Sequence, residues 1–338
     1  MNRVLSRAIG ILGLSVLFAM TGCDHVTDPP DGPNLIDRFG PFEVVADLES
    51  DRDEVDFSVG QVVTFTAQFN KNIDWVITIT GQSSGAVKRI EGFDRFVDEE
   101  NAVWNGSTTD LPFFSAEMCE VILSVPEEEY TDTVMVNVLG ARIYPGVLAA
   151  DFEENPGACI ILGDFEFELT PASGRQEDIP AGQGSFFYRL EGTDNESGGP
   201  TDNFFVGLAE VLPCLNGVTY YDVPTTIPEN LFLNFMLRGR NSAYTRAIIG
   251  VAIDSNDSGD WNDGVDQVYE IVIDPLYEGW RLQSANMGEL GIPQEDLSKI
   301  VNIRLVLISL NNLQPSPREQ VGFEVDFFTF TDGAPLEL

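Results

Sequence analysis

The sequence predicts an all-β fold, and three observations support that prediction. From about residue 42 to the end, apolar and polar residues alternate in short runs, which is the period of strands buried on one face. The runs are rich in Val, Ile, Thr and Phe and are bounded by Gly, Pro, Asn and Asp. No glycine-rich phosphate loop, parallel βαβ pattern or repeat of fixed period interrupts them. We therefore expect antiparallel sheets.

Residues 1–22 predict an export signal. Arg3 and Arg7 precede the apolar run "AIGILGLSVLFAM", which is too short to cross a bilayer comfortably. The sequence "AMTGCD" then resembles the cleavage box of bacterial lipoproteins, in which small residues precede a cysteine that becomes lipidated, with Met20 where leucine is usual. An ordinary secretory signal is the alternative. We expect lipidation at Cys23, a membrane contact through that lipid anchor, and a place in the cell envelope, on the outer membrane and facing the exterior.

Residues 23–40 are predicted to be a flexible tether. The stretch "DHVTDPPDGPNLIDRFG" is rich in Pro, Asp and Gly and has no apolar periodicity. A segment of this composition would hold the folded part away from the membrane.

The charge and the histidine count exclude several functions. The formal net charge is -37, with 55 acidic against 18 basic residues, so the surface repels nucleic acid. The only histidine is His25, beside the predicted anchor. Ser/His/Asp triads, Cys/His dyads and histidine-ligated zinc are therefore excluded from the folded part. We expect no required cofactor.

Three cysteines follow Cys23, namely Cys119, Cys159 and Cys214. Outside the cytoplasm one pair could close, which leaves three possible pairings and one free thiol. We favour a disulfide between Cys159 and Cys214, because both fall in the second predicted domain.

Residues 41–143 are predicted to form an immunoglobulin-like sandwich. Strand-like runs of the length found in such sandwiches occur here: "QVVTFTAQF", "WVITIT", "CEVILSV" and "DTVMVNVL". The stretch "AVWNGSTTD" also resembles a turn of bacterial Ig-like modules. We interpret Trp104, within it, as a core anchor.

Residues 144–338 are predicted to form a larger jelly-roll sandwich. Ten strand-like runs occur in about 195 residues, and "PQEDLSKI" suggests a single helical turn. The runs are "GVLAADFE", "DFEFEL", "GSFFYRLEG", "NFFVGLAEVL", "LFLNFMLRG", "RAIIGVAID", "QVYEIVID", "GWRLQSANM", "VNIRLVLISL" and "VGFEVDFFTFTD".

This second region resembles a known family. The resembling stretches are "FFYRLEG", "ENLFLNFMLRG", "IIGVAIDSNDSGDWNDGVDQVYEIVI", "EGW" and "FEVDFFTFTDGAPL". They are similar to the C-terminal, galactose-binding-like jelly rolls of surface glycan-binding lipoproteins from Bacteroidetes-type polysaccharide-utilisation systems. The resemblance implies an Ig-like spacer before a module that captures polysaccharide or oligosaccharide, with outer-membrane transport proteins as partners. It implies no individual binding residue.

The stretch "DSNDSGDWNDGVD", residues 254–266, raises the question of a calcium site. Its first six residues copy the EF-hand spacing, but Val265 stands where the bidentate glutamate belongs, and apolar strand sequences flank it. An EF-hand is therefore rejected. Calcium in another geometry remains a hypothesis, with ligands among Asp254, Asn256, Asp257, Asp260 and Asp263. The alternative is a hairpin connection in which Asp, Asn and Gly serve the turn geometry.

Trp261, in the middle of this acidic loop, is the first candidate for glycan contact. Either its indole folds back onto the sandwich, or it is exposed and can stack against a sugar ring while nearby carboxylates and amides bond the hydroxyls. Trp280, Tyr220 and Tyr221 are the further aromatic candidates.

We expect a binding protein and not an enzyme. Glycoside hydrolysis needs two carboxylates facing one another, and Glu270 and Glu324, in apolar strands, are single candidates that nothing in the sequence pairs. The main expectation is a lipid-anchored surface protein that captures polysaccharide for uptake or degradation. The alternatives are a structural or adhesive lipoprotein that binds protein partners, and a carboxylate-dependent glycosidase.

Overall fold

The structure is a computed structural model, and it describes residues 40–153, 160–162, 169–193, 203–213, 218–262, 264–310 and 318–338. Residues 43–338 form one compact unit. In the described ranges nearly all regular structure is β-strand, so the predicted all-β fold is confirmed. No described helix is long and apolar enough to cross a membrane.

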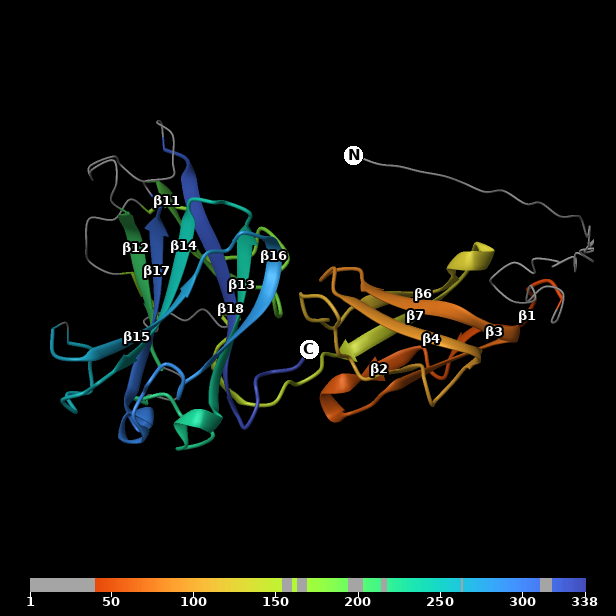
Figure 1. Cartoon of the computed structure of the whole chain (residues 1–338), viewed down its shortest axis with the longest axis horizontal. Coiled ribbons are helices and arrows are strands. Elements are labelled where there is room, and N and C mark those ends of the chain that lie inside the picture. Colours follow the sequence, from red (N-terminus) through yellow and green to blue (C-terminus); the bar gives the residue numbers. More distant parts are fainter. Residues whose placement is uncertain are drawn as a thin grey trace, which may run out of the picture. The chain divides into compact units, whose positions relative to one another are not determined.

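Residues 44–140 contribute one seven-stranded sheet (Figure 1). Its order is β1-β3-β6-β7-β2, and β4 and β5 pair with β3. The strands are β1 (Val44–Ser50), β2 (Glu54–Asp56), β3 (Val63–Gly81), β4 (Val87–Val97), β5 (Val103–Trp104), β6 (Met118–Val125) and β7 (Tyr130–Gly140). Two 3₁₀ turns accompany them, η1 (Phe57–Val59) and η2 (Pro126–Glu128). The designation of this part as an Ig-like spacer stays a prediction.

Strand β3 corrects one sequence expectation. The runs at 61–69 and 75–80 are predicted as separate strands, but they form a single strand of 19 residues. Lys71 lies between the two predicted runs; its side chain is only 6% exposed and forms an ion pair with Glu128 at 2.8 Å. Burial on one face of the strand therefore continues from the first run into the second. A paired lysine can occupy an inward position that its charge alone would forbid. Trp104 is fully buried between Phe57 and Phe114, as expected of a core anchor.

Residues 147–332 form two further sheets that face one another. The six-stranded sheet has the order β10-β11-β18-β13-β16, with β8 paired to β18, and the five-stranded sheet has the order β15-β14-β17-β12-β9. All pairs are antiparallel. The strands are β8 (Val147–Ala150), β9 (Ile160–Leu162), β10 (Gly174–Gln176), β11 (Phe187–Thr193), β12 (Phe204–Val211), β13 (Leu231–Arg240), β14 (Thr245–Ile253), β15 (Gln267–Ile273), β16 (Glu278–Asn286), β17 (Ile300–Ser309) and β18 (Gln320–Asp332). We call this part the C-terminal sandwich.

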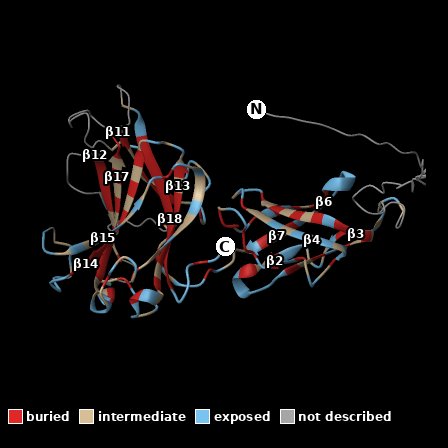
Figure 2. Ribbon diagram, in the orientation of Figure 1, coloured by how far each residue is buried: buried red, intermediate tan, exposed pale blue. Residues whose placement is uncertain are grey.

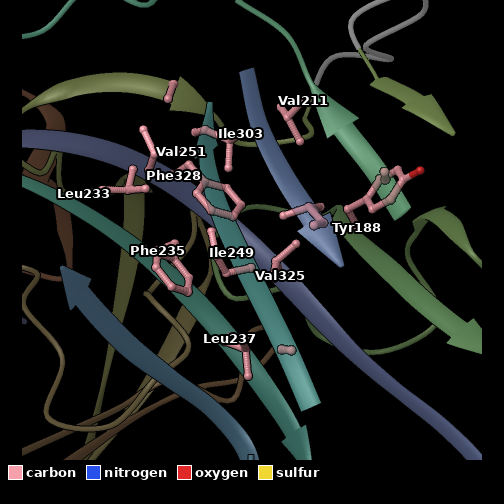
Figure 3. Close-up of a cluster of buried hydrophobic side chains, with 14 of the residues drawn as sticks. Tyr188, Val211, Leu233, Phe235, Leu237, Ile249, Val251, Ile303, Val325 and Phe328 are labelled. Atoms are coloured by element: carbon pink, nitrogen blue, oxygen red, sulfur yellow. The ribbon is translucent and has the colours of Figure 1, made fainter. Parts of the chain in front are cut away.

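The core of the C-terminal sandwich lies between its two sheets. Alternate residues of each strand point inward and form one buried hydrophobic cluster. Phe235 of β13 stacks on Phe328 of β18, with ring centroids 5.2 Å apart, while Ile249, Val251 and Ile303 meet them from the other sheet (Figure 3). Burial of these side chains, each worth about 1.5–3 kcal/mol, is the main term that stabilises the sandwich.

The outer faces of the two sheets differ. Strand β18 is buried at 11 consecutive positions, Val321 to Thr331, so its outer face is covered as well (Figure 2). The five-stranded sheet has an accessible outer face, on which Ile161, Phe205 and Val272 are more than a third exposed. Two 3₁₀ turns, η5 (Pro228–Asn230) and η6 (Gln294–Lys299), lie in this part, and η6 is the helical turn expected at "PQEDLSKI".

Candidate functional site

Polar side chains form a row across the outer face of the five-stranded sheet. Strand register places Glu210 of β12 beside Arg304 of β17, and Arg304 beside Gly250 of β14, which in turn faces Glu270 of β15. On the other side, Ile161 of β9 faces Glu210. Directly paired residues of an antiparallel sheet point to the same face. This row therefore lies on the accessible outer face of the five-stranded sheet.

A pocket of about 620 Å³ opens where this row meets the loop between β14 and β15. Glu210, Asn302 and the loop residues Gly259 to Asn262 line it, together with Ile161 and Thr219. We call it the Trp261 pocket. An aromatic ring, an amide and carboxylates around a concave surface form the residue set that carbohydrate recognition uses.

Asn302 is the most informative residue of the Trp261 pocket. Its side chain is fully buried, yet neither the amide nitrogen nor the amide oxygen has a hydrogen-bond partner among the described residues. Leaving a buried polar group unpaired costs about 1–3 kcal/mol. Both atoms have less than 1 Å² of exposed surface, so a ligand hydroxyl can accept from the nitrogen and donate to the oxygen only after the residues that cover the amide move aside.

Trp261 is partly buried and is fixed by a cation. The guanidinium carbon of Arg304 lies 4.9 Å from the centroid of the indole, within the range of a cation–π contact. Arg304 Nε lies 3.3 Å from Glu210 Oε1 in an ion pair whose side chains are about one-fifth exposed. Burial raises the pKa of Glu210, and the nearby Arg304 partly opposes that shift. The ion pair between Arg304 and Glu210 and the indole of Trp261 therefore fix one another's positions.

Gly250 provides the space for this arrangement. A Cβ atom at this position would lie 2.7 Å from Cγ1 of Val268 and 3.3 Å from Cβ of Arg304. A larger residue would collide first with Val268, and Arg304 would have to shift by a few tenths of an ångström. A glycine inside an otherwise β-branched strand is consistent with close approach of a neighbouring side chain.

The acidic loop is organised around Asp254, which is fully buried. Its Oδ1 accepts from the backbone N–H of Ser258 at 3.0 Å, and its Oδ2 accepts from Gly259 N–H and from the Tyr220 hydroxyl, each at 2.7 Å. Gly259 adopts φ +84°, a left-handed conformation that suits glycine. Burial raises the pKa of Asp254, but these hydrogen bonds together outweigh it and hold the pKa below the usual value.

Asp257 and Asp266 of the loop have protein partners too. Asp266 accepts from the backbone N–H groups of Ser255 and Asn262, and Asp257 pairs with Lys299 at 2.9 Å. Among the described residues no group of three or more His, Cys, Asp or Glu side chains is arranged to hold a metal ion. These contacts support the turn interpretation of the loop. Calcium binding stays a prediction, and of its proposed ligands Asp263 lies outside the described residues.

Removing the central acceptor of the loop should destabilise it. We expect Asp254→Ala to lower the free energy of unfolding by about 1–3 kcal/mol, because the partly buried Gly259 N–H and Tyr220 hydroxyl lose their acceptor. The matched change Asp260→Ala, at an exposed carboxylate, should alter it by less than about 0.5 kcal/mol. Denaturant unfolding followed by fluorescence measures both, and equal effects of the two substitutions would contradict the role assigned to Asp254.

The Asp254 carboxylate also makes the stability of the loop depend on pH in the acid range. Because the folded-state pKa of Asp254 is lowered, its stabilisation is present above the unfolded value of about 3.9 and is lost as the pH falls through the folded value. Asp254→Asn should therefore flatten the acid limb of the curve of unfolding free energy against pH.

Repeating the titration with millimolar calcium tests whether the loop binds this ion. A rise in melting temperature that Asp254→Ala abolishes would establish calcium binding.

The remaining predicted aromatics do not join Trp261 in the pocket. Tyr221 is only 6% exposed and donates its hydroxyl to the carbonyl of Val211, so it is a core residue and the prediction of a glycan contact there is wrong. Tyr220 lies beside the pocket and is held by Asp254. Trp280 belongs to the other sheet, where its Nε1 donates to the Pro180 carbonyl at 3.0 Å and its ring packs on Phe187. These contacts give Trp280 a structural role.

Several sequence predictions fall outside the described residues. Cys23 and the disulfide between Cys159 and Cys214 are among them. Cys119 of β6 is described: it is buried and makes no disulfide, and burial, with a contribution from Glu117, raises the pKa of its thiol to about 12.

The two single carboxylate candidates for catalysis are not paired. Glu270 lies on the exposed face of the five-stranded sheet, whereas Glu324 lies in β18 of the other sheet and is fully buried. Glu324 contacts Arg189, Arg238 and Arg240. A carboxylate held by three guanidinium groups and closed to solvent cannot serve as an acid or a nucleophile for a polysaccharide.

Comparisons with known proteins complete the description. No protein-family model matches the chain, and no curated protein matches it. Among solved structures, a carbohydrate-binding module from the β-sandwich superfamily is 9% identical, covers 86% of this chain and 98% of its own, and has a TM-score of 0.36.

Two further solved structures are similar to this chain to a comparable degree. A surface glycan-binding protein, SGBP-B, from a xyloglucan utilization locus of Bacteroides uniformis is 12% identical, with coverage of 86% and 73% and a TM-score of 0.39. The family 11 module of Clostridium thermocellum, in complex with a mixed-linked tetrasaccharide, is 15% identical, with coverage of 57% and 98% and a TM-score of 0.33. Because all three TM-scores are below 0.5, these similarities support no inference about a ligand. We base the choice of ligand on the residues of the Trp261 pocket instead.

Proposed function

We propose that the protein binds a saccharide in the Trp261 pocket. The observation that carries the proposal is Asn302, a fully buried amide whose nitrogen and oxygen have no partner among the described residues. Trp261 supplies a partly accessible indole beside it, and Glu210, Thr219 and Asn262 add groups that can bond hydroxyls. A sugar ring offers both an apolar C–H face and paired hydroxyls, so it matches the two halves of the pocket.

The wider role that we propose is capture at the cell surface. A lipid on Cys23 and the tether of residues 23–40 would hold the sandwich outside the outer membrane, where bound polysaccharide stays near transport and degradation partners. Binding, and not hydrolysis, is supported by the pairing of Glu210 with Arg304 and by the absence of a second enclosed carboxylate in the described pocket lining. Protein adhesion is the competing function.

Affinity electrophoresis against a panel of plant, algal and microbial polysaccharides tests the proposal. Retardation by at least one glycan, with the polymer length unchanged during the run, is the expected result. Absence of retardation by every polymer would favour protein adhesion. Shortening of a polymer would instead indicate a glycosidase.

Lipidation is tested separately. Metabolic labelling with a fatty acid should mark the wild-type protein and leave Cys23→Ala unlabelled, and the variant should partition into the aqueous phase of a detergent extract. Each acyl methylene adds about 0.8 kcal/mol to membrane binding, so loss of the chains should release the protein. Cys119→Ala is the matched control, since that thiol is buried and should not affect labelling. Label that persists in Cys23→Ala would exclude this anchor.

A further inference from the structure

The charges of the Trp261 pocket have one sign. Two of the described residues that line it are charged, Glu210 and Asp260, and both are acidic. Asp260 is exposed at the loop tip, whereas Glu210 is largely buried at the sheet surface. Both carboxylates therefore line the space that a ligand would occupy.

The nearest cation is already engaged. Arg304 lies over the ring of Trp261 and pairs with Glu210, so recruiting it for an anionic ligand would break both contacts. Lys299, at the end of η6, pairs with Asp257 on the same loop. Each cation therefore already has an acidic partner, although Arg304 Nε makes no hydrogen bond to Glu210.

The surroundings strengthen the negative potential. Asp254 and Asp266 lie in the same loop as Asp260, and the chain as a whole carries a formal charge of -37. Unit charges of like sign repel appreciably over several ångströms near a protein surface, where the effective dielectric constant is about 20. The amide of Asn302, by contrast, is neutral and suited to hydroxyl groups.

We propose that the Trp261 pocket selects uncharged saccharides and rejects those that carry carboxylate or sulfate groups. This inference rests on the proposed function, which it narrows to a class of ligand. The selectivity arises from repulsion by Asp260, which has no ion-pair partner among the described residues, and from the lack of any cation among the described lining residues; the charge of Glu210 is already paired with Arg304.

The test compares each neutral polysaccharide that retards the protein with its own carboxymethylated derivative. We expect the derivative to bind at least about tenfold more weakly in dilute buffer. Molar sodium chloride shortens the screening length to about 3 Å, so the difference should shrink there if its origin is electrostatic. A difference that salt leaves unchanged would indicate steric exclusion and would overturn the proposal.

A charge variant tests which residue is responsible. Asp260→Asn keeps the size of the side chain and removes its charge. It should lower the ratio of the affinity for the neutral polysaccharide to that for the carboxymethylated derivative by several-fold. Glu120→Gln removes the same charge from an exposed site on β6, outside the C-terminal sandwich, and should leave the ratio unchanged. Equal effects of both variants would assign the selectivity to net charge and not to the pocket.

The outcomes separate the inference from the proposed function. If an acidic polysaccharide binds as tightly as a neutral one, and Trp261→Ala abolishes that binding, the selectivity is disproved while saccharide binding at the pocket stands. If no polysaccharide of either kind binds, the proposed function itself fails.

Discussion

Trp261→Ala should weaken binding of the recognised polysaccharide at least about tenfold, which corresponds to about 1.4 kcal/mol. Aromatic side chains at the centre of a binding surface commonly contribute more than this when they are removed. The indole lines the pocket beside Asn302, and Arg304 lies over its ring, so its orientation is fixed before the ligand arrives. Affinity electrophoresis and calorimetry measure the loss.

Trp280→Ala is the matched control for the loss of an indole. Trp280 lies on the other sheet, with its Nε1 bonded to the Pro180 carbonyl, and its removal should leave the dissociation constant unchanged as long as the sandwich is folded. Circular dichroism checks the fold of both variants. A folded Trp261→Ala protein that binds the polysaccharide as well as the wild type does would show that the Trp261 pocket is not the binding site.

Glu324→Ala should be among the most destabilising single substitutions in the protein. Its carboxylate is fully buried, and Arg189 Nε contacts Oε1 at 2.9 Å while Arg240 contacts the same oxygen and Arg238 contacts Oε2 at 3.4 Å. Removing one partner from a buried ionic cluster costs about 3–5 kcal/mol. Arg189 keeps Asp178 and Arg240 keeps Glu191, but the three positive charges lose the buried carboxylate that they share. Urea unfolding measures the change in free energy.

Asp274→Ala provides the control for this prediction. Asp274 pairs with Arg246 at 2.7 Å, a distance similar to that between Arg189 and Glu324, but both side chains are about a third exposed. An exposed pair of this kind is worth about 0–1 kcal/mol because solvent screens it. If both variants lose the same stability, burial of Glu324 is not what makes its cluster important.

Short runs of β-branched and aromatic residues sufficed to predict β8 and β11 to β18 of the C-terminal sandwich, but the three-residue strands β9 and β10 were not predicted. The continuous strand β3 was missed because Lys71 looks like a turn residue until its partner Glu128, far away in sequence, is known. Residues 164–169, predicted as a strand, lie mostly outside the described residues.

The candidate site was predicted only in part. Trp261 stood out because an indole in an acidic loop has no apolar neighbours in sequence. Asn302, Arg304 and Glu210 did not, although the first two interrupt the aliphatic run of β17 at alternate positions, which places them on one face. What the sequence lacked was the register between β12, β17 and the loop, which brings Glu210 and Asn302 to the same pocket as Trp261. Tyr221 illustrates the opposite error, since a tyrosine beside a proline-rich stretch looks exposed until its hydroxyl is seen to bond Val211.

The hydrogen bonds of Asp254 also bear on the kinetics of capture. Because the loop satisfies this carboxylate with its own Ser258 and Gly259 N–H groups and the Tyr220 hydroxyl, it does not have to become ordered when a ligand arrives. A loop that is already held by its own hydrogen bonds loses little conformational entropy when a ligand binds. Different glycans should therefore associate with the pocket at similar rates, and their affinities should differ mainly in how long each one stays bound.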